Sequence, residues 1–480
     1  MTSYEPVIGL EIHAELLTDS KMFCGCEVVD TTVTAPNIAT CVVCTAQPGA
    51  LPVVNREAVT YAMRVGLALN CTINTFNQFD RKSYFYPDLP KGYQITQYGH
   101  PIAADGWLDI EVGGQTKRIG IRRAHMEEDT GKSIHVGGYS LVDLNRAGVP
   151  LLEIVTEPDF RSVEELEVFA RKLRAILVYL GVNHGDMSKG VLRFEANVSV
   201  RPTGAEVLGT RTEIKNLNSI RSMVRASAYE IERQSALLAA GGEVQQQTMG
   251  FNETTGETFT QRIKETADDY RYFPEPDLPP LIIEEAWVDE VRASLPELPD
   301  AKKARFIEAH GIKDEDAETL VGDLAVADYF DAAVAAGGDP QTTANWITGE
   351  LFREMNDKNL TVDALNVPPE ALVALIGLVD ADTINNNTAK KVLKIMLEEG
   401  GDPGAIVEAR GLAQISDEGA LEAIVDRILE ENPENVATYL GGKEGLFGWF
   451  VGQVMRETRG KANAALVNDL LAEKLEARRE

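Results

Sequence analysis

Hydrophobic and polar residues alternate strictly over Gly9–Leu16, near the start of the chain. Alternation with a period of two is typical of a β-strand with one buried face and one polar face. On such a strand Glu11, His13 and Glu15 point to the same side, with neighbours roughly 6.5–7 Å apart. A carboxylate–imidazole–carboxylate row suits a divalent cation or general acid–base chemistry, although it also suits a plain solvated face.

The same reading of hydrophobic period predicts the other elements before residue 295. Strands are expected over 117–123, 132–135, 139–144, 150–156, 191–201 and 210–215. Helices are expected from Asn55 to about Leu69, from Ser162 to Gly181 and from Asn218 to Gly241, each beginning with a capping residue. Short strands broken by glycine indicate a largely antiparallel sheet.

Two segments are predicted to lack regular structure. Phe79–Gln94 interleaves basic and aromatic side chains, a composition that suits phosphates and a stacked base, or equally a packed surface loop. Its notable members are Arg81, Lys82, Tyr84, Phe85, Tyr86, Lys91 and Tyr93. Asp268–Pro280 contains so many prolines that we expect an extended segment.

Beyond Leu295 the strand signals nearly vanish and helical periodicity dominates. A second boundary is expected near residues 408–414, and the last stretch should include helices over 443–458 and 463–479. Three basic residues gather where the first of these helices ends, where they could meet phosphate or complement the helix dipole: Arg456, Arg459 and Lys461. The pattern therefore predicts an α+β fold: a mixed, largely antiparallel β domain, an all-helical domain and a small helical tail.

Length and charge narrow the class of protein. A chain of 480 residues is too long for one core, so about two to four domains are expected. No apolar run is long enough to span a membrane and no secretory signal opens the chain, which predicts a cytoplasmic protein. The net charge of −29 argues against a broad nucleic-acid surface, so any nucleic acid should be held by a few local contacts.

Four of the five cysteines are close in sequence: Cys24, Cys26, Cys41 and Cys44. A Cys-x-Cys pair followed by Cys-x-x-Cys in a cytosolic chain indicates a four-thiolate zinc site. Four thiolates leave no open position on the metal, so its role would be structural. The alternative is a set of unrelated buried cysteines, and Cys71 is interpreted as a plain core residue.

Further acidic residues occupy strand-like settings. They are Glu127–Asp129, Asp143 with the amide Asn145, and the pair Glu153 and Glu157. If these strands converge on the first one, carboxylates and an imidazole would line a site for Mg²⁺. Such a site would support phosphoryl transfer, in which the metal neutralises developing charge.

Other catalytic designs are excluded. Thr130–Ser133 resembles the end of a P-loop, but the glycine that a P-loop requires is Met126 here. There is no Gly-x-Ser-x-Gly nucleophile elbow, and the paired cysteines are better explained by zinc than by Cys–His catalysis.

Taken together, the motifs resemble the B subunits of the aspartyl/glutamyl-tRNA(Asn/Gln) amidotransferases over essentially the whole chain. They are Val7–Leu16, Asp80–Asp88, His125–Lys132, Leu141–Ile154, Glu213–Ser219, Asp269–Asp277, Val451–Met455 and Gly460–Asn463. The resemblance implies a cradle-shaped catalytic domain, a helical domain and a tRNA-binding tail. We place these over 1–295, 296–408 and 409–480.

The resemblance also implies an activity and partners. Members of this family assemble with an amidase subunit, which releases ammonia from glutamine, and with a small third subunit. They use ATP to activate the side-chain carboxylate of mischarged Glu-tRNA(Gln) or Asp-tRNA(Asn), and ammonia then attacks it. A carboxylate needs this activation because its leaving group would otherwise be oxide.

Site residues follow from the resemblance. His13, Glu128 and Glu153 are the expected Mg²⁺ ligands, with Glu11 beside them as a further catalytic residue. The four clustered cysteines correspond to the structural Zn²⁺ site of many members. The ATP site is assigned from composition instead: the basic and aromatic segment would bind ATP through Arg81, Lys82, Tyr84 and Lys91.

One alternative remains at this stage, and a second is excluded. The chain could be a non-catalytic, zinc-containing scaffold that binds tRNA. An archaeal-type relative specific for glutamyl-tRNA(Gln) would carry an extra inserted domain, for which this chain has no room. The sequence leaves open which mischarged tRNA is the substrate in the cell.

Overall fold

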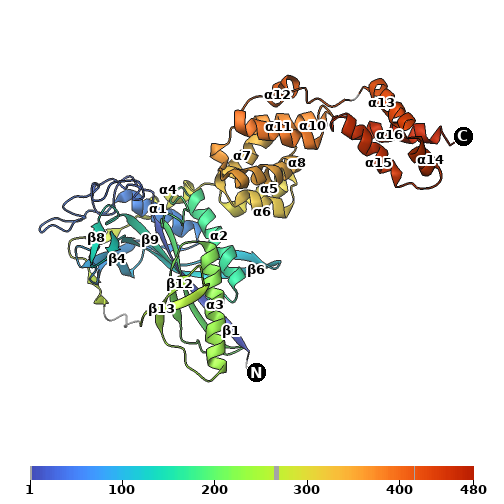
Figure 1. Ribbon diagram of the computed structural model, residues 1–480. Helices are drawn as coiled ribbons and strands as arrows, with labels where there is room; N and C mark the ends of the chain where they lie inside the picture. The colour runs from blue at the N-terminus through green and yellow to red at the C-terminus, as the bar shows by residue number, and fades with distance from the viewer. Residues whose placement is uncertain (1–2, 264–269, 416, 480) are drawn as a thin grey trace. The chain divides into compact units, whose positions relative to one another are not determined.

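The computed structural model describes residues 3–263, 270–415 and 417–479 and divides into two compact units. The first unit is Met1–Ala301 and the second is Lys302–Glu480 (Figure 1). This division lies close to the boundary predicted near residue 295. The further division near residue 408 stays a prediction.

The first unit combines strands with a few helices. Its elements are β1 (Tyr4–Glu15), α1 (Arg56–Ala68), β2 (Thr72–Ile73), β3 (Phe76–Ser83), β4 (Tyr93–His100), β5 (Ala103–Val112), β6 (Gln115–Glu128), β7 (Lys132–Val136), β8 (Tyr139–Asp143), β9 (Pro150–Thr156), α2 (Val163–Tyr179), β10 (Leu192–Pro202), β11 (Thr212–Leu217), α3 (Ile220–Ala239), β12 (Gln247–Asn252), β13 (Glu257–Ile263), β14 (Phe273–Pro274), β15 (Leu281–Ile282) and α4 (Glu285–Ala293).

The strands form one large sheet and a separate β7–β8 hairpin. The main path of the sheet runs β13-β12-β11-β10-β1-β9-β6-β4-β3-β14, with β2, β5 and β15 attached beside it. Among the described pairs only β11 and β12 run parallel, so the predicted mixed, largely antiparallel fold is confirmed. β1 lies between β10 and β9, which places the first strand of the chain near the middle of the sheet.

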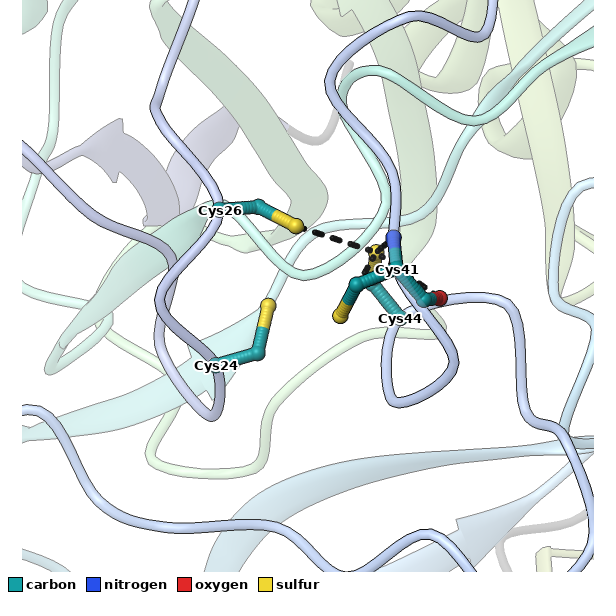
Figure 2. Close-up of side chains that lie close together, drawn as sticks. All are labelled: Cys24, Cys26, Cys41 and Cys44. Carbon is teal, nitrogen blue, oxygen red and sulfur yellow. Dashed lines mark hydrogen bonds between the residues drawn. The ribbon is translucent and has the colours of Figure 1, made fainter.

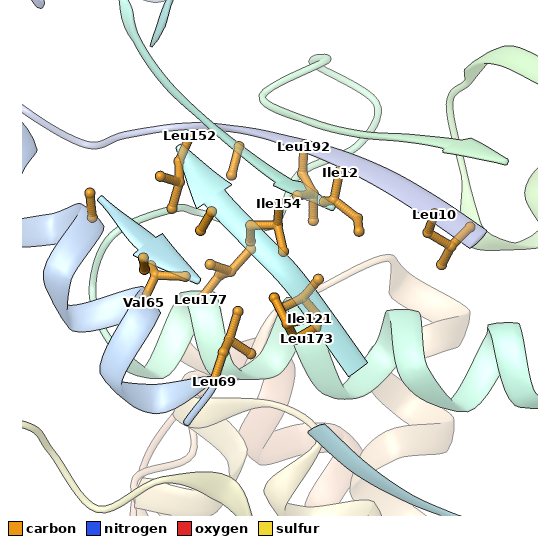
Figure 3. Close-up of a cluster of buried hydrophobic side chains, with 14 of the residues drawn as sticks. Leu10, Ile12, Val65, Leu69, Ile121, Leu152, Ile154, Leu173, Leu177 and Leu192 are labelled. Atoms are coloured by element: carbon orange, nitrogen blue, oxygen red, sulfur yellow. The ribbon is translucent and has the colours of Figure 1, made fainter. Parts of the chain in front are cut away.

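One face of this sheet carries the hydrophobic core (Figure 3). Leu10 and Ile12 of β1 and Ile154 of β9 are almost completely buried there. They pack with the apolar stripe of α2, to which Leu173 and Leu177 belong. Because side chains alternate along a strand, the polar residues of β1 and β9 are turned to the opposite face.

Helix starts agree with capping chemistry, with one correction. The side chains of Asn55 and Ser162 accept hydrogen bonds from the first turns of α1 and α2, as predicted. The predicted cap of α3, Asn218, is wrong: Ser219 is the capping residue, and its hydroxyl accepts from the backbone N–H of Ser222 at 3.0 Å. A cap must lie within reach of the first orphan amides, and Asn218 is one residue too early.

The two segments expected to be irregular contain strands. In the basic and aromatic segment, the residues before Tyr84 belong to β3 and those after Gly92 belong to β4. The two strands pair, and residues 84–92 connect them. The proline-rich segment contributes one short strand, β14, and a second, β15, follows directly after it; both pair with β3. Proline lacks an N–H donor but is tolerated at a sheet edge, which is where Pro274 lies. Part of the predicted segment, residues 268 and 269, lies outside the described residues.

The described part of the second unit is helical. Its elements, with α5 crossing the division, are α5 (Pro299–His310), α6 (Asp314–Val321), α7 (Leu324–Ala335), α8 (Pro340–Asn345), the π-helix η2 (Trp346–Leu351), α9 (Phe352–Lys358), η3 (Val362–Ala364), α10 (Pro369–Asp380), α11 (Asn386–Glu399), α12 (Pro403–Ala409), α13 (Glu418–Glu431), α14 (Pro433–Leu440), α15 (Leu446–Glu457) and α16 (Ala464–Glu476). The last two match the helices predicted over 443–458 and 463–479. The final helices share a core of their own, to which Val425, Phe450 and Leu471 belong. Among the described residues, no helix combines the length and apolarity that crossing a bilayer requires.

Candidate functional site

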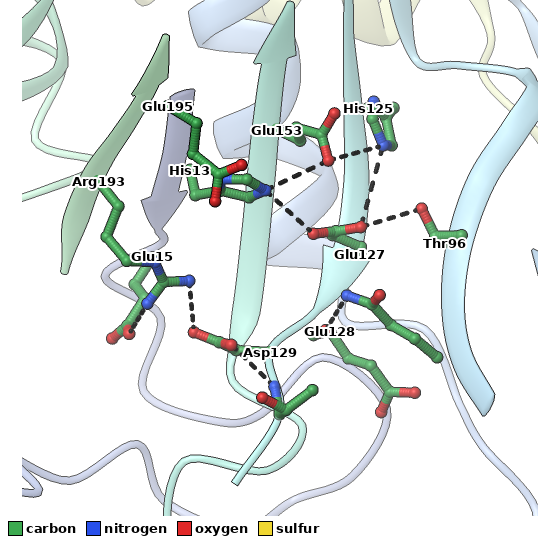
Figure 4. A network of polar contacts seen from close by, with 12 residues as sticks. His13, Glu15, Thr96, His125, Glu127, Glu128, Asp129, Glu153, Arg193 and Glu195 are labelled. Atoms are coloured by element: carbon green, nitrogen blue, oxygen red, sulfur yellow. Dashed lines mark hydrogen bonds and ion pairs between the residues drawn. The ribbon is translucent and has the colours of Figure 1, made fainter. Parts of the chain in front are cut away.

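Strand register places two expected metal ligands, His13 and Glu153, in one row with His125 on the polar face of the sheet. His13 of β1 pairs with Glu153 of β9, and Glu153 pairs in turn with His125 of β6. Glu127 follows two positions along β6, so it faces the same side. Figure 4 shows the carboxylates of Glu127 and Glu153 between the two imidazole rings.

The distances define a compact cluster. His13 Nε2 lies 3.3 Å from Glu153 Oε2 and 3.9 Å from Glu127 Oε1. One ligand atom from each of these three residues lies within 4.8 Å of the other two. The Thr96 hydroxyl donates to Glu127 Oε2 at 3.2 Å and fixes that carboxylate. An imidazole and two carboxylates at this spacing are a donor set that can hold a divalent cation.

Burial and the close charges shift the pKa values of the groups in this cluster. For His13, burial would lower the pKa, but the hydrogen bond and charge of Glu153 outweigh burial and raise the pKa to about 9. Burial, reinforced by the charge of Glu153, raises the pKa of Glu127 to about 7. Two crowded carboxylates facing one imidazole therefore gain from any further positive charge placed between them.

Lys82 supplies positive charge on the same face. Burial would lower its pKa, but the charge of Glu127 and other nearby groups outweigh burial and raise the pKa well above its ordinary value. Its Nζ lies over the rings of Tyr84 and Tyr270, at 5.9 and 5.3 Å from their centroids. The Tyr84 hydroxyl donates to Gln94 Oε1 at 3.1 Å. Two of the four residues predicted to bind ATP therefore border the cluster.

Arg81 and Lys91, the other two residues predicted to bind ATP, lie on the opposite face of the sheet together with Glu128. The Glu128 carboxylate pairs with Lys91 and accepts from the backbone N–H of Ile95 at 3.0 Å. Arg81 pairs with Glu275 at 2.7 Å and stacks on the ring of Tyr93, 4.2 Å from its centroid. The structure therefore does not bring Glu128 into the cluster of His13 and Glu153, and Glu127 lies in its place.

Glu11 lies one row further along the polar face, in a second acidic group with Glu195 and Glu213. Asn197 Nδ2 donates to Glu11 Oε1 at 3.0 Å, and Lys215 pairs with both Glu195 and Glu213. Burial, followed by the charges of Glu153 and Glu195, raises the pKa of Glu11. A cavity of about 200 Å³ opens beside Glu11, and its lining includes Gly9, Thr156, Ser199, Leu208 and Arg211.

The four clustered cysteines come together in space (Figure 2). The sulfur atoms of Cys26 and Cys44 are 4.0 Å apart, and those of Cys41 and Cys44 are 3.9 Å apart. Four sulfur atoms at this spacing could hold a tetrahedral metal such as zinc, for which metal–sulfur bonds are about 2.3 Å. A hydrogen bond with Cys24, followed by the backbone N–H of Cys41 and the charge of Lys21, lowers the pKa of Cys44 to about 4 despite its burial. Cys71 lies apart in the hydrophobic core, as predicted.

A fully buried lysine supports the cysteine cluster. Lys21 is 0% exposed, and its Nζ donates to the backbone carbonyls of Ala39 and Leu144 at 2.8 and 3.3 Å. The same Nζ lies 3.7 Å from Cys44 Sγ. A buried ammonium beside thiolates offsets their negative charge.

The remaining acidic candidates have structural partners. Asp143 Oδ1 accepts from the backbone N–H of Asn37 at 3.0 Å, which ties the cysteine segment to the end of β8. The Oδ1 of Asn145 accepts a hydrogen bond from the backbone N–H of Ala39 at 2.9 Å, which is a second link to the cysteine segment. Glu157 forms an ion pair with Arg122, and Arg193 forms ion pairs with both Asp129 and Glu15.

Sequence reasoning missed three residues of these sites. Glu127 is one of the acidic candidates in the sequence, but Glu128 is the ligand that the resemblance implies; the sequence predicts no role for His125 or Lys21. A signal existed for the first two, because His125 and Glu127 share the parity of alternate positions on one strand. No local pattern distinguishes Lys21.

Comparison with known proteins identifies the family of the chain. Residues 6–289 match the family described as the GatB/GatE catalytic domain, and residues 328–475 match the GatB domain. Relatives named as B subunits of aspartyl/glutamyl-tRNA(Asn/Gln) amidotransferases include those of Moorella thermoacetica, Geobacter sulfurreducens and Caldanaerobacter subterraneus. They are 52%, 51% and 50% identical to this chain; each alignment covers 98% of this chain and at least 99% of the relative. The chain therefore belongs to the family of aspartyl/glutamyl-tRNA(Asn/Gln) amidotransferase B subunits.

Proposed function

We propose that this chain is the amidating subunit of a glutamine-dependent, tRNA-dependent ligase. It would use ATP to phosphorylate the side-chain carboxylate of Glu-tRNA(Gln) or Asp-tRNA(Asn), and ammonia would then displace the phosphate as an amide forms. The observation that carries this proposal is the cluster of His13, Glu127 and Glu153 on the polar face of the sheet. A merely tRNA-binding scaffold has no need for buried carboxylates that converge on an imidazole.

The donor set fits a magnesium ion. In this proposal His13, Glu127 and Glu153 hold Mg²⁺; thus Glu127 replaces Glu128 in the ligand set expected from sequence. The ion, when bound, would offset the negative charge that builds up between phosphate and carboxylate. Lys82, charged and bordering the cluster, would contact the transferred phosphoryl group.

The nucleotide needs a place on the same face of the sheet. We assign its nucleoside part to the cavity beside Glu11, whose lining combines apolar side chains with the exposed guanidinium of Arg211. Tyr84 and Lys82 remain in the proposed phosphate site. Arg81 and Lys91 are left out because their charges are already paired on the opposite face.

The thiolate cluster is proposed to hold Zn²⁺ in a structural role. All four tetrahedral positions would be filled by Cys24, Cys26, Cys41 and Cys44, so no position would be open for substrate. Zinc would fix the long connection between β1 and α1, whose described residues form no helix or extended strand.

The names of the relatives describe one subunit of an amidotransferase, which supports work in a multi-subunit complex. We propose that an amidase subunit supplies the ammonia and that a small third subunit completes the complex, in the cytoplasm. The helical tail would contact tRNA locally, and the exposed Arg456 and Arg459 offer positive charge there.

A single-turnover assay of the assembled complex tests the proposal. Wild type should convert Glu-tRNA(Gln) to Gln-tRNA(Gln) with ATP, Mg²⁺ and free ammonia, with Asp-tRNA(Asn) tried in parallel. Glu127→Gln should abolish conversion while tRNA binding persists. The matched control is Glu157→Gln, a half-exposed carboxylate paired with Arg122, which should convert normally.

Conversion of neither tRNA by wild type would contradict the proposed reaction. Normal conversion by Glu127→Gln would show that the cluster is structural and would favour the scaffold alternative.

A further inference from the structure

Exposed apolar side chains gather on residues 31–55, the stretch that carries two of the clustered cysteines and leads to α1. Five large apolar residues there are 60–81% exposed: Val33, Ile38, Val42, Leu51 and Val53. The same stretch contains no aspartate, glutamate, lysine, arginine or histidine, although 25% of the whole chain is charged. Single exposed apolar residues are ordinary in proteins, but a group of them without charges marks an interaction site.

The hairpin of β7 and β8 carries a second group of exposed apolar residues. Register pairs Ile134 with Leu141 and Val136 with Tyr139, so these four side chains share one face of the hairpin. They are 39–63% exposed. A two-stranded hairpin is marginally stable by itself in water, so its apolar face gains from a partner that covers it.

Hydrogen bonds hold the two groups next to each other. Asn37 Nδ2 donates to the backbone carbonyl of Val142 at 2.9 Å, and Asn37 Oδ1 accepts from the N–H of Leu144 at 2.8 Å. Asn145 Nδ2 donates to the backbone carbonyl of Ala35 at 2.7 Å. In Figure 1 the blue connection after β1 accordingly lies beside β8. The exposed apolar residues of both segments therefore lie on neighbouring parts of the molecule, which we call the apolar surface.

The scarcity of charge on these segments decides what kind of molecule fits them. Nucleic acid is held through its phosphates, mainly by lysine and arginine. Residues 31–55 contain neither, and Lys132 is the only such residue in the sequences of β7 and β8. The core of a protein–protein interface, in contrast, is rich in apolar and aromatic side chains and depleted in charge. The relatives are named as one subunit of an amidotransferase, which implies partner subunits of a different kind.

We propose that the apolar surface docks a different protein subunit of the amidotransferase, which meets it with an apolar, largely uncharged surface of its own. This inference rests on the multi-subunit complex of the proposed function and extends it by locating one interface. It also gives the clustered cysteines a further purpose. Zinc bound there would hold residues 31–55 in shape before docking, which lowers the entropy lost on association.

Charged substitutions test the interface with the full-length chain and the purified amidase and third subunits. Val33→Asp and Tyr139→Asp each place a carboxylate in the apolar surface, and neither residue is a proposed metal ligand. Each variant should bind the other subunits at least about 10-fold more weakly than wild type, because a buried unpaired charge is costly. Val207→Asp is the matched control, since Val207 is 81% exposed, as Val33 is, and lies outside both segments. It should bind as wild type does.

Hydrogen exchange of the wild type gives a second measurement that needs no variant. Backbone amides of residues 31–55 and 132–143 should exchange more slowly in the assembled complex than in the full-length chain alone. Amides of residues 203–209, around Val207, should exchange at the same rate in both.

The outcomes separate this inference from the proposed reaction. Wild-type affinity in both variants, with unchanged exchange of the two segments, would overturn the docking surface. Protection that appears only when tRNA is added would overturn it in favour of a nucleic-acid surface. Self-association of the chain alone that Val33→Asp abolishes would overturn it in favour of a second copy. A wild-type complex that shows the protection but amidates neither tRNA would contradict the proposed reaction and leave the docking surface in place.

Discussion

Glu127 and Glu128 are adjacent on β6 and point to opposite faces of the sheet. Glu127 lies 3.9 Å from the His13 imidazole, whereas Glu128 accepts a backbone hydrogen bond from Ile95 at 3.0 Å. A shift of one residue along a strand thus separates a carboxylate of the candidate cation site from one that joins neighbouring strands.

This relationship predicts different outcomes for the two glutamine variants. Glu127→Gln should weaken Mn²⁺ binding at least about 10-fold, because it removes one negative ligand. Glu128→Gln should bind Mn²⁺ normally but lower the free energy of unfolding by about 1–3 kcal/mol, since Lys91 loses its charged partner. Calorimetric titration and denaturant unfolding measure the two effects. Weak Mn²⁺ binding by Glu128→Gln together with normal binding by Glu127→Gln would instead support the ligand set predicted from sequence, with Glu128.

Cysteine substitution tests the thiolate site. Cys44→Ser should reduce bound zinc from about one ion per chain to near zero, because a hydroxyl is a poor replacement for a thiolate. Cys71→Ser should retain zinc, since Cys71 lies in the core apart from the cluster. Elemental analysis of the purified complexes gives the zinc content. Equal zinc loss in both variants would indicate general unfolding instead.

Lys21 should control how firmly that metal is held. Lys21→Met keeps the length of the side chain but removes the charge and the hydrogen bonds to Ala39 and Leu144. We expect zinc to transfer to a chromogenic chelator at least about 10-fold faster than from wild type. Lys189→Met is the control, because Lys189 contacts the same segment through the exposed Asp30. Unchanged release from Lys21→Met would contradict a supporting role.

Glu230 should make stability depend on pH. It is 0% exposed on α3 and accepts hydrogen bonds from Arg233, Gln234 and Thr212. Burial would raise its pKa, but these bonds, the Arg233 bond first, outweigh burial and lower the pKa below its ordinary value of 4.5. The stabilisation is therefore fully present above pH 4.5 and is lost as the pH falls through the folded-state pKa.

Glu230→Gln should accordingly lower the free energy of unfolding by about 2–4 kcal/mol at pH 7. The difference from wild type should shrink as the pH falls below 4.5 and then through the lowered folded-state pKa, where the glutamate itself becomes neutral. Urea unfolding at a series of pH values measures this difference. A difference that stays constant down to pH 3 would mean that the charge of Glu230 is not what stabilises the fold.

Much of the local structure follows from sequence patterns because its causes lie within a few residues. The cap at Asn55 depends only on the amides of the next turn, and the alternation of β1 depends only on hydrophobic burial. The error at Ser219 is of the same local kind and amounts to one position. The strands β3 and β4 were missed because their basic and aromatic residues resemble a loop, whereas pairing within the sheet made them strands.

Local sequence patterns are enough to establish that Glu11 and His13 share a face, that four cysteines can meet locally, and that a strand-rich region precedes a helical one along the chain. Which carboxylate joins His13 cannot be read from local patterns, because it depends on strand order and register between residues more than a hundred positions apart. With β9 between β1 and β6, Glu153 lies beside His13, and Glu127 is the member of its pair that faces them. Alternation is a local property of the backbone, whereas register is fixed by long-range pairing and by the burial of a whole face.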